Sequence, residues 1–282
     1  MKEFIAIFKN ELYKTAKRPR TYIGFGVILF ICLTLQAAFY NDGKEILSFF
    51  TNQIDNLFNV HGNVLNGNLI CFLLLQTLIV QMPLLVALVT GDSVSGETAS
   101  GTIRFLLATP ASRSKIILAK WLSGLCYTLL LLGLLGFMAL VVSKWIFGSG
   151  DLMALNSEAL TIIRGDDINW RWAAAFVIAF LSLAVVASLG QMISCFIDNS
   201  ITPIVSVMAI IIIFTIIGMF DLPSFDLIRP LLFTTHMISW KSLFEDPIPF
   251  SDIYFSCIVL IIHIVAFLSI SIFYFNRKDI LT

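Results

Sequence analysis

"AAAFVIAFLSLAVVASLGQMISCFI" occupies residues 173–197 and contains no Asp, Glu, Lys or Arg. A helix needs about 20 predominantly apolar residues to cross the hydrocarbon core of a bilayer. Over the whole chain, hydrophobic residues make up 58% and charged residues 13%, whereas soluble domains carry about 25% charged residues. The stretch therefore predicts a membrane-spanning helix in an integral membrane protein.

Five further apolar runs have the length of a span. They cover about 22–40, 68–89, 122–142, 203–220 and 253–275. These runs are too long and too uniformly apolar for the alternating strands of a membrane barrel, and a helix satisfies its own backbone hydrogen bonds in lipid. We expect an all-α integral membrane protein with six transmembrane helices in a single domain, residues 1–282.

The distribution of Lys and Arg predicts the orientation of these helices. If both chain ends are cytoplasmic, the inner segments 1–20, 90–121, 198–202 and 276–282 hold twelve Lys and Arg residues. The outer segments 41–67, 143–171 and 221–252 then hold six. Because cytoplasmic loops carry the excess of positive charge, we predict an N-in, C-in topology.

Two segments outside the spans have apolar patterns of their own. In residues 1–20, the apolar side chains of Phe4, Ile5, Phe8, Leu12 and Ala16 recur at helical spacing, with lysines between them. This pattern predicts an amphipathic cytoplasmic helix at the inner membrane interface; the alternative is a basic flank that only sets topology. Residues 221–252 are too apolar for a free loop, and we expect a partly re-entrant segment between helices five and six.

The sequence offers no complete catalytic, metal-binding or nucleic-acid-binding motif. The histidines His61, His236 and His263 stand outside any HExxH arrangement, and no GxSxG elbow is present. We therefore predict no catalytic residue, no cofactor or metal site and no nucleic-acid partner. His263, within a span, is expected to form a hydrogen bond between helices rather than to act in catalysis.

The predicted spans contain neutral polar groups in place of ionisable ones. Gln76, Gln81 and Gln191 are candidates for lining a translocation path. The alternative is that they form hydrogen bonds that hold helices together. Because the spans contain no carboxylate or basic group suited to an ion gradient, we expect the energy source to lie outside them.

Residues 91–115, "GDSVSGETASGTIRFLLATPASRSK", interrupt two apolar runs on the predicted cytoplasmic side. Glu97 stands where the G-x-x-x-x-G-K-[ST] phosphate loop requires lysine, and no βαβ unit precedes it. The loop is thus not a nucleotide site. Ile103, Leu106 and Leu107 instead predict a short amphipathic helix that Pro110 ends, which suits docking into a groove of another protein.

This loop resembles the signature of ABC-2 type transporter permeases, the membrane-spanning subunits of bacterial ABC exporters. The resemblance rests on Asp92, Gly96, Glu97, Gly101, Thr102, Arg104, Leu106, Leu107, Pro110, Arg113 and Lys120. It extends more loosely to the N-terminal helix, the segment before the last span and the basic tail "FNRKDI".

The resemblance implies a permease in the bacterial cytoplasmic membrane that pairs with a second permease copy or a sister permease. Two copies of a separate ABC ATPase subunit would hold ATP and Mg and contact residues 92–110. Peptide antibiotics, drugs and lipid-like molecules all fit as exported substrates. The alternatives are a non-transporting membrane sensor or assembly anchor, and an intramembrane enzyme that would depend on His263.

Overall fold

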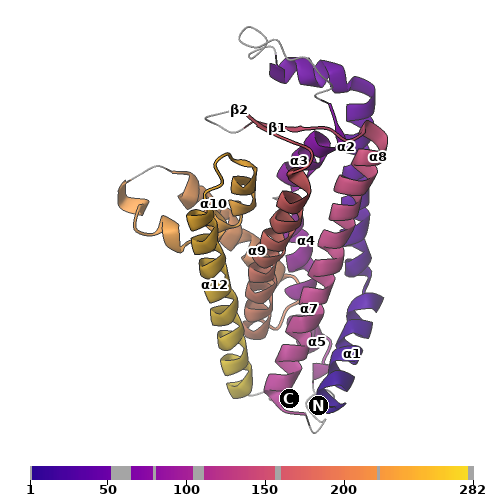
Figure 1. Ribbon diagram of the computed structural model, residues 1–282. Helices are drawn as coiled ribbons and strands as arrows, with labels where there is room; N and C mark the ends of the chain where they lie inside the picture. Colours follow the sequence, from indigo (N-terminus) through magenta and orange to yellow (C-terminus); the bar gives the residue numbers. More distant parts are fainter. Residues whose placement is uncertain are drawn as a thin grey trace.

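The computed structural model describes residues 2–51, 65–78, 81–103, 111–155, 160–220 and 223–278. The molecule is an elongated bundle of long helices, with both chain termini at the same end (Figure 1). Within the described residues, five helices are long and apolar enough to cross a membrane, or six if one bent pair counts as a span. The expectation of a helical, multi-pass membrane protein is confirmed; six spans and their orientation stay predictions.

The end of the bundle that holds both termini is built from α1, the start of α2 and the short helix α5. α1 spans Lys2–Lys17 and α2 spans Pro19–Thr51, of which Pro19–Gly43 is a candidate span. α5 spans Ser95–Ala99. α1 packs along the first turns of α7, so it lies against the bundle rather than apart from it (Figure 1).

The second apolar run forms two helices in place of one straight span. α3 (Gly67–Leu78) and α4 (Gln81–Thr90) meet at an angle of 54°. Pro83 lies in the first turn of α4, where its missing N–H leaves no hydrogen bond unmade. The predicted run 68–89 therefore contains a helix start that its composition alone does not reveal.

The helix that contains the third predicted span extends beyond 122–142 at both ends. α7 (Arg113–Gly136) continues through a π-helical segment, η1 (Phe137–Val142), into α8 (Ser143–Phe147). The Gln36 amide of α2 donates to the Met138 carbonyl at 2.8 Å inside this π segment. Because α7 starts at residue 113, Lys120 lies within the helix and not in the loop before it.

A small hairpin interrupts the helical architecture at the end opposite the termini. β1 (Leu152–Leu155) pairs with β2 (Leu160–Ile163) in an antiparallel register that places Leu152 opposite Ile163. Both of these side chains are buried, so the predicted polar loop 143–171 contributes to the core.

The segment between α10 (Thr202–Met219) and α12 (Phe250–Arg277) consists of short helical turns. These are η2 (Pro223–Phe225), η3 (Arg229–Leu231), α11 (Phe233–His236) and η4 (Ser239–Phe244). Phe244 is buried, with its ring centroid 4.5 Å from that of Trp172 and 5.6 Å from that of Phe72. The segment is thus part of the bundle core; its depth in a membrane stays a prediction.

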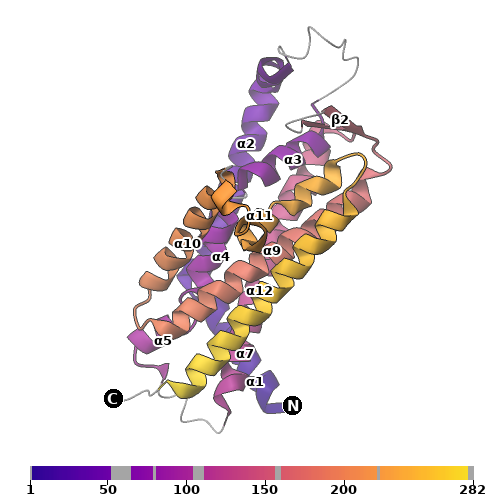
Figure 2. The ribbon, with the colours of Figure 1, turned by 90° about the vertical axis from the view of Figure 1, so that its left-hand side faces the viewer.

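α9 (Ile168–Phe196) is the central helix and packs against α4, α7, α10 and α12 (Figure 2). Its small residues allow the close contacts. A Cβ atom on Gly190 would lie 2.5 Å from the Thr90 hydroxyl and 3.3 Å from the Gly91 nitrogen of the α4 end. The tight crossing of α9 and α4 lies directly beside the loop that the sequence singled out.

Candidate functional site

A cluster of seven charged residues lies at the end of the bundle that holds the termini. We call it the charged cluster, and it consists of Glu11, Lys14, Arg18, Arg20, Asp92, Glu97 and Lys120. These residues come from α1, the start of α2, the 91–99 segment and α7. The cluster therefore joins three separate parts of the chain.

Glu97 and Glu11 share two lysines at the centre of the cluster. The Lys120 ammonium lies 2.8 Å from one oxygen of each carboxylate, and the Lys14 ammonium lies 2.8 Å from Glu97 and 3.0 Å from Glu11. The Lys120 side chain is 1% exposed and also donates to the Ser93 carbonyl at 3.1 Å. A lysine buried to this degree requires paired carboxylates, and these two supply them.

Asp92 forms the second centre of the charged cluster. Its carboxylate lies 2.9 Å from Arg20 and 3.4 Å from Arg18, and it accepts a hydrogen bond from the Ser200 hydroxyl. Gly96 makes room for it, since a Cβ atom at this position would lie 2.4 Å from an Asp92 oxygen. Asp92 and Gly96 are one helical turn apart, and glycine at position 96 leaves space for the Asp92 carboxylate.

The ionic neighbours outweigh burial in setting the charge of the central groups. Burial alone would raise the pKa of Glu97, but the ammoniums of Lys120 and Lys14 together lower it by more than burial raises it. The pKa of Glu97 therefore lies below its ordinary 4.5. Burial would lower the pKa of Lys14, yet the carboxylates of Glu97 and Glu11 raise it above 10.5. Both groups are therefore ionised across the physiological range.

α5 is fixed to the central helix α9 as well as to the charged cluster. The Ser194 hydroxyl of α9 accepts hydrogen bonds from the backbone N–H groups of Val94 and Ser95, at 3.0 and 2.9 Å. These are two of the donors that a helix N-terminus leaves without intrahelical partners. The start of α5 therefore moves with α9.

The predicted coupling residues fall into buried and exposed groups. Asp92 and Glu97 are buried, whereas the backbone at 99–102 is exposed. Gly101 has φ +70°, a conformation that favours glycine. The Thr102 hydroxyl donates to the Glu97 carbonyl at 3.3 Å and closes this turn. Arg104, Leu106, Leu107 and Pro110 lie outside the described residues.

Arg113 ties the start of α7 to the end of α12. Its Nη1 donates to the carbonyls of Phe275, Asn276 and Lys278, at 3.2, 3.3 and 2.8 Å. These carbonyls lie in the last turn of α12 and just beyond it, where a cation interacts favourably with the helix dipole. This predicted site residue therefore acts as a helix cap in the structure.

The three glutamines proposed for a translocation path lie in different surroundings. Gln76 is exposed on α3, and Gln81 is half-buried at the start of α4. Gln191 is buried, and its amide donates to the Ile117 carbonyl of α7 at 2.9 Å. Gln191 thus forms the interhelical hydrogen bond that was the alternative to path lining.

His263 was expected to bond between helices, and this expectation is wrong. Its Nδ1 bonds to the Val259 carbonyl of its own helix at 2.8 Å. The ring packs at the edges of Phe233 and Phe267, with centroids 5.7 Å away in each case. The contact with Phe233 of α11 is between helices, whereas Val259 and Phe267 belong to the same helix as His263, α12.

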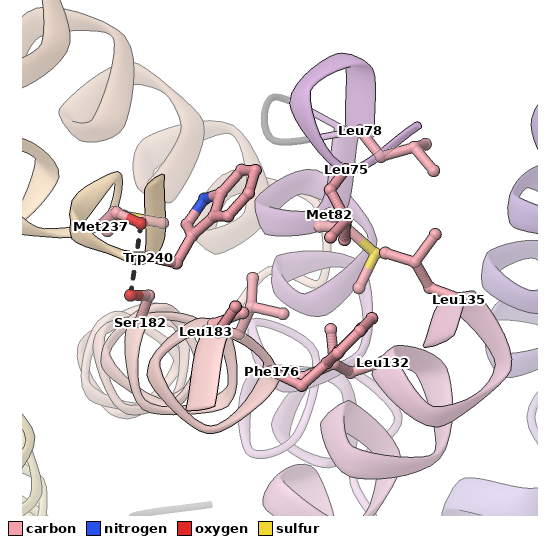
Figure 3. A pocket seen from close by; sticks show the side chains of 12 residues that line it. Leu75, Leu78, Met82, Leu132, Leu135, Phe176, Ser182, Leu183, Met237 and Trp240 are labelled. Atoms are coloured by element: carbon pink, nitrogen blue, oxygen red, sulfur yellow. Dashed lines mark hydrogen bonds between the residues drawn. The ribbon is translucent and has the colours of Figure 1, made fainter. Parts of the chain in front are cut away.

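A small apolar cavity lies between α3, α4, α7, α9 and η4 (Figure 3). It measures about 50 Å³, and Leu75, Met82, Leu135 and Trp240 point toward it from four of these elements. Its hydroxyl, on Ser182, already donates to the carbonyls of Ile178 and Met237. The cavity offers apolar surface beside the bend between α3 and α4.

The sequence pattern missed the partners of the two acidic site residues. The pattern places Lys14 on the polar face of an interfacial helix and counts Arg18 and Arg20 only among the charges that set topology, and it gives no role to Glu11. One signal was available: Glu11 lies on the same helical face as Lys14, Thr15 and Arg18, at spacings of three and four. That face is polar, and it is the one that packs on α7, where Thr15 bonds to Ser123 at 2.9 Å.

Comparison with known proteins places the chain among uncharacterised relatives. A family described as "Protein of unknown function (DUF2705)" matches residues 26–281. The chain is also 24% identical over 200 residues to the "Uncharacterized protein YhcI" of Bacillus subtilis (strain 168). That alignment covers 68% of this chain and 63% of the relative's length.

Proposed function

The chain belongs to the DUF2705 family, and we propose that it is the membrane-spanning permease subunit of an ATP-driven exporter. A separate ATPase subunit supplies the energy by docking at residues 99–102 and the segment that follows. The charged cluster is the observation that carries this proposal. It provides a rigid connection between a short surface turn and the helices of the bundle.

The connection works through three sets of contacts. Glu97 is held to α1 and α7 by Lys14 and Lys120, and Asp92 is held to the start of α2 by Arg20. Ser194 fixes the backbone of α5 to α9. A force applied to the exposed turn at residues 99–102 therefore reaches α1, α2, α7 and α9 together, as a coupling element requires.

The sequence resemblance to ABC-2 permeases supports the identity of the motor. Glu97 stands where a phosphate loop has lysine, and its carboxylate forms ion pairs with Lys14 and Lys120 of the same chain. ATP would then be bound and hydrolysed, with Mg, by two ATPase copies on the partner side. Dimerisation with a second permease or a sister permease follows from the same resemblance.

The test is recovery of an ATPase with the affinity-purified chain from its native membrane. Ala99 is exposed at the end of α5 and outside the charged cluster. We expect Ala99→Trp to reduce recovery of the ATPase by about tenfold, the effect of losing roughly 1.4 kcal/mol of binding energy. Ser251→Trp is the matched control, because Ser251 is equally exposed at the opposite end of the bundle.

The same preparation distinguishes the alternatives. If wild-type chain is recovered without an ATPase, and ATP leaves its behaviour in vesicles unchanged, the exporter proposal is wrong and a sensor or anchor is favoured. If Ala99→Trp retains a stoichiometric, active ATPase, the docking position is wrong. An essential role of His263 would instead point to an intramembrane enzyme.

A further inference from the structure

A second apolar concavity lies on the lateral surface of the helical bundle, apart from the charged cluster. This groove of about 320 Å³ is bordered by α4, α10 and α11, and α10 packs beside both of the other helices (Figure 2). Ile212 and Met219 of α10 line it and are 52% and 79% exposed. In a membrane, these side chains would contact the hydrocarbon core.

One buried polar side chain in the groove has no hydrogen-bond partner among the described residues. The Thr234 side chain lines the groove, Thr234 is only 8% exposed, and its hydroxyl forms no hydrogen bond there. Thr215 lines the same groove, but its hydroxyl donates to the Ile211 carbonyl of its own helix. A buried hydroxyl without a partner costs about 1–3 kcal/mol, so a ligand that pairs with Thr234 would recover this energy.

We propose that this groove binds an acyl chain of a membrane phospholipid, whose ester carbonyl accepts a hydrogen bond from the Thr234 hydroxyl. The apolar walls match the chain, and the buried, unpaired Thr234 hydroxyl matches the polar group at the head of that chain. A helix of a second copy fits less well, because the backbone carbonyls of a membrane helix are already paired within it. The site does not depend on the proposed ATPase partner.

The experiment uses the full chain in vesicles of phosphatidylethanolamine and phosphatidylglycerol. A trace of phosphatidylglycerol carries a photoreactive diazirine on the acyl chain near its ester, and labelled residues are mapped by mass spectrometry. We expect labelling of the groove to exceed that of the exposed α2 face at Phe30 and Leu33 several-fold. Phe30 and Leu33 are 71% and 54% exposed, so they report ordinary contact with the bilayer.

Two isosteric substitutions separate the proposed hydrogen bond from general packing. Thr234→Val should lower groove labelling about fivefold, as expected for a lost hydrogen bond of about 1 kcal/mol. Thr215→Val should leave it unchanged. Thr234→Val also removes a buried unpaired hydroxyl, so the variant should fold in detergent at least as stably as the wild type.

A third substitution fills the site. At Gly218, an added Cβ atom would lie 3.4 Å from the Thr235 hydroxyl and near no other atom of the described residues, so Gly218→Trp should occupy the groove and abolish its labelling. The proposal is overturned if Thr234→Val, like Thr215→Val, leaves groove labelling at the wild-type level. It is overturned equally if the groove is labelled no more strongly than the α2 face. It is also overturned if cross-linking shows a second copy covering the groove.

Discussion

The carboxylate of Glu97 lies within 4.0 Å of three cations, Lys14, Arg18 and Lys120. Breaking a buried ion pair by removing one partner costs about 3–5 kcal/mol, because the remaining charge stays buried without compensation. When Glu97 is lost, Lys14 and the 1% exposed Lys120 are left to share the single carboxylate of Glu11. One residue of a short loop thus supports the packing of α1 on α7.

We expect Glu97→Gln to lower the free energy of unfolding by about 3–5 kcal/mol at neutral pH, measured by denaturation in detergent micelles. Glu3→Gln is the control, because the Glu3 side chain is 62% exposed beside Lys115. It should change the stability by no more than about 0.5 kcal/mol. Equal effects of the two variants would show that the charged cluster does not stabilise the fold.

The pH dependence follows from the lowered pKa of Glu97. A carboxyl group whose pKa is lower in the folded state than in the unfolded state stabilises the fold in full at pH values above its unfolded-state pKa. That contribution is lost as the pH falls through the folded value, which here lies below 4.5. The gap between wild type and Glu97→Gln should therefore be constant near neutral pH and narrow below about pH 4.5.

At the scale of single elements, the close contact between α4 and α9 depends on a glycine. A Cβ atom on Gly190 would lie 2.5 Å from the Thr90 hydroxyl, and Thr90 in turn lies against Gly124 of α7. Three helices therefore meet where α4 leads into the loop with Asp92 and Glu97. Any widening of this contact would shift that loop relative to α7.

We expect Gly190→Ala to destabilise the protein by about 1–3 kcal/mol, the usual effect of overpacking a tight core. Gly133→Ala is the matched control, because no described residue lies within 4 Å of a Cβ atom at Gly133 of α7. In detergent, the midpoint temperature of thermal unfolding should fall for Gly190→Ala and should not fall for Gly133→Ala. A neutral Gly190→Ala would mean that α4 and α9 can separate freely.

The elements show how far composition predicts this fold. Apolar runs identify every long helix, since length and hydropathy decide whether a segment can span. They do not identify the bend before α4, although Pro83 offered a local signal, nor the hairpin 152–163. The apolar runs also begin the third span after Lys120, because a charged residue interrupts them. In the structure, Lys120 lies inside α7, where Glu11 and Glu97 pair with it. Such pairing depends on tertiary contacts that a periodicity does not contain.

At the scale of the whole molecule, the two ends of the bundle differ in chemistry. The end with the termini carries the seven residues of the charged cluster, whereas the described residues at the other end include the ion pair of Arg171 with Asp167, at 2.7 Å, and contacts between neutral groups. There Asn66 and Asn68 donate to the carbonyls of Asp151 and Gly150, each at 2.6 Å. This asymmetry matches the excess of Lys and Arg that predicts the cytoplasmic side.

The predicted orientation is tested by labelling single cysteines in intact cells, in a background without the five native cysteines. Ser251→Cys should react with a membrane-impermeant maleimide from outside, and Ser100→Cys only after permeabilisation. Both positions are exposed. Ser100 directly follows α5, at the end of the bundle that holds the termini, whereas Ser251 lies in the first turn of α12, which begins away from that end (Figure 1). The reverse pattern would contradict the N-in, C-in topology and the proposed docking of a cytoplasmic ATPase.

The charged cluster also has a consequence for how the chain is made. Lys14, Arg18 and Arg20 are synthesised well before Asp92, Glu97 and Lys120. Until the ribosome has passed residue 120, the early cations remain largely without their final carboxylates. In that interval they can hold the N-terminus on the cytoplasmic face, as positive flanks do. The same charges would then serve twice: first to direct insertion, and later to fasten the first helix to the finished bundle.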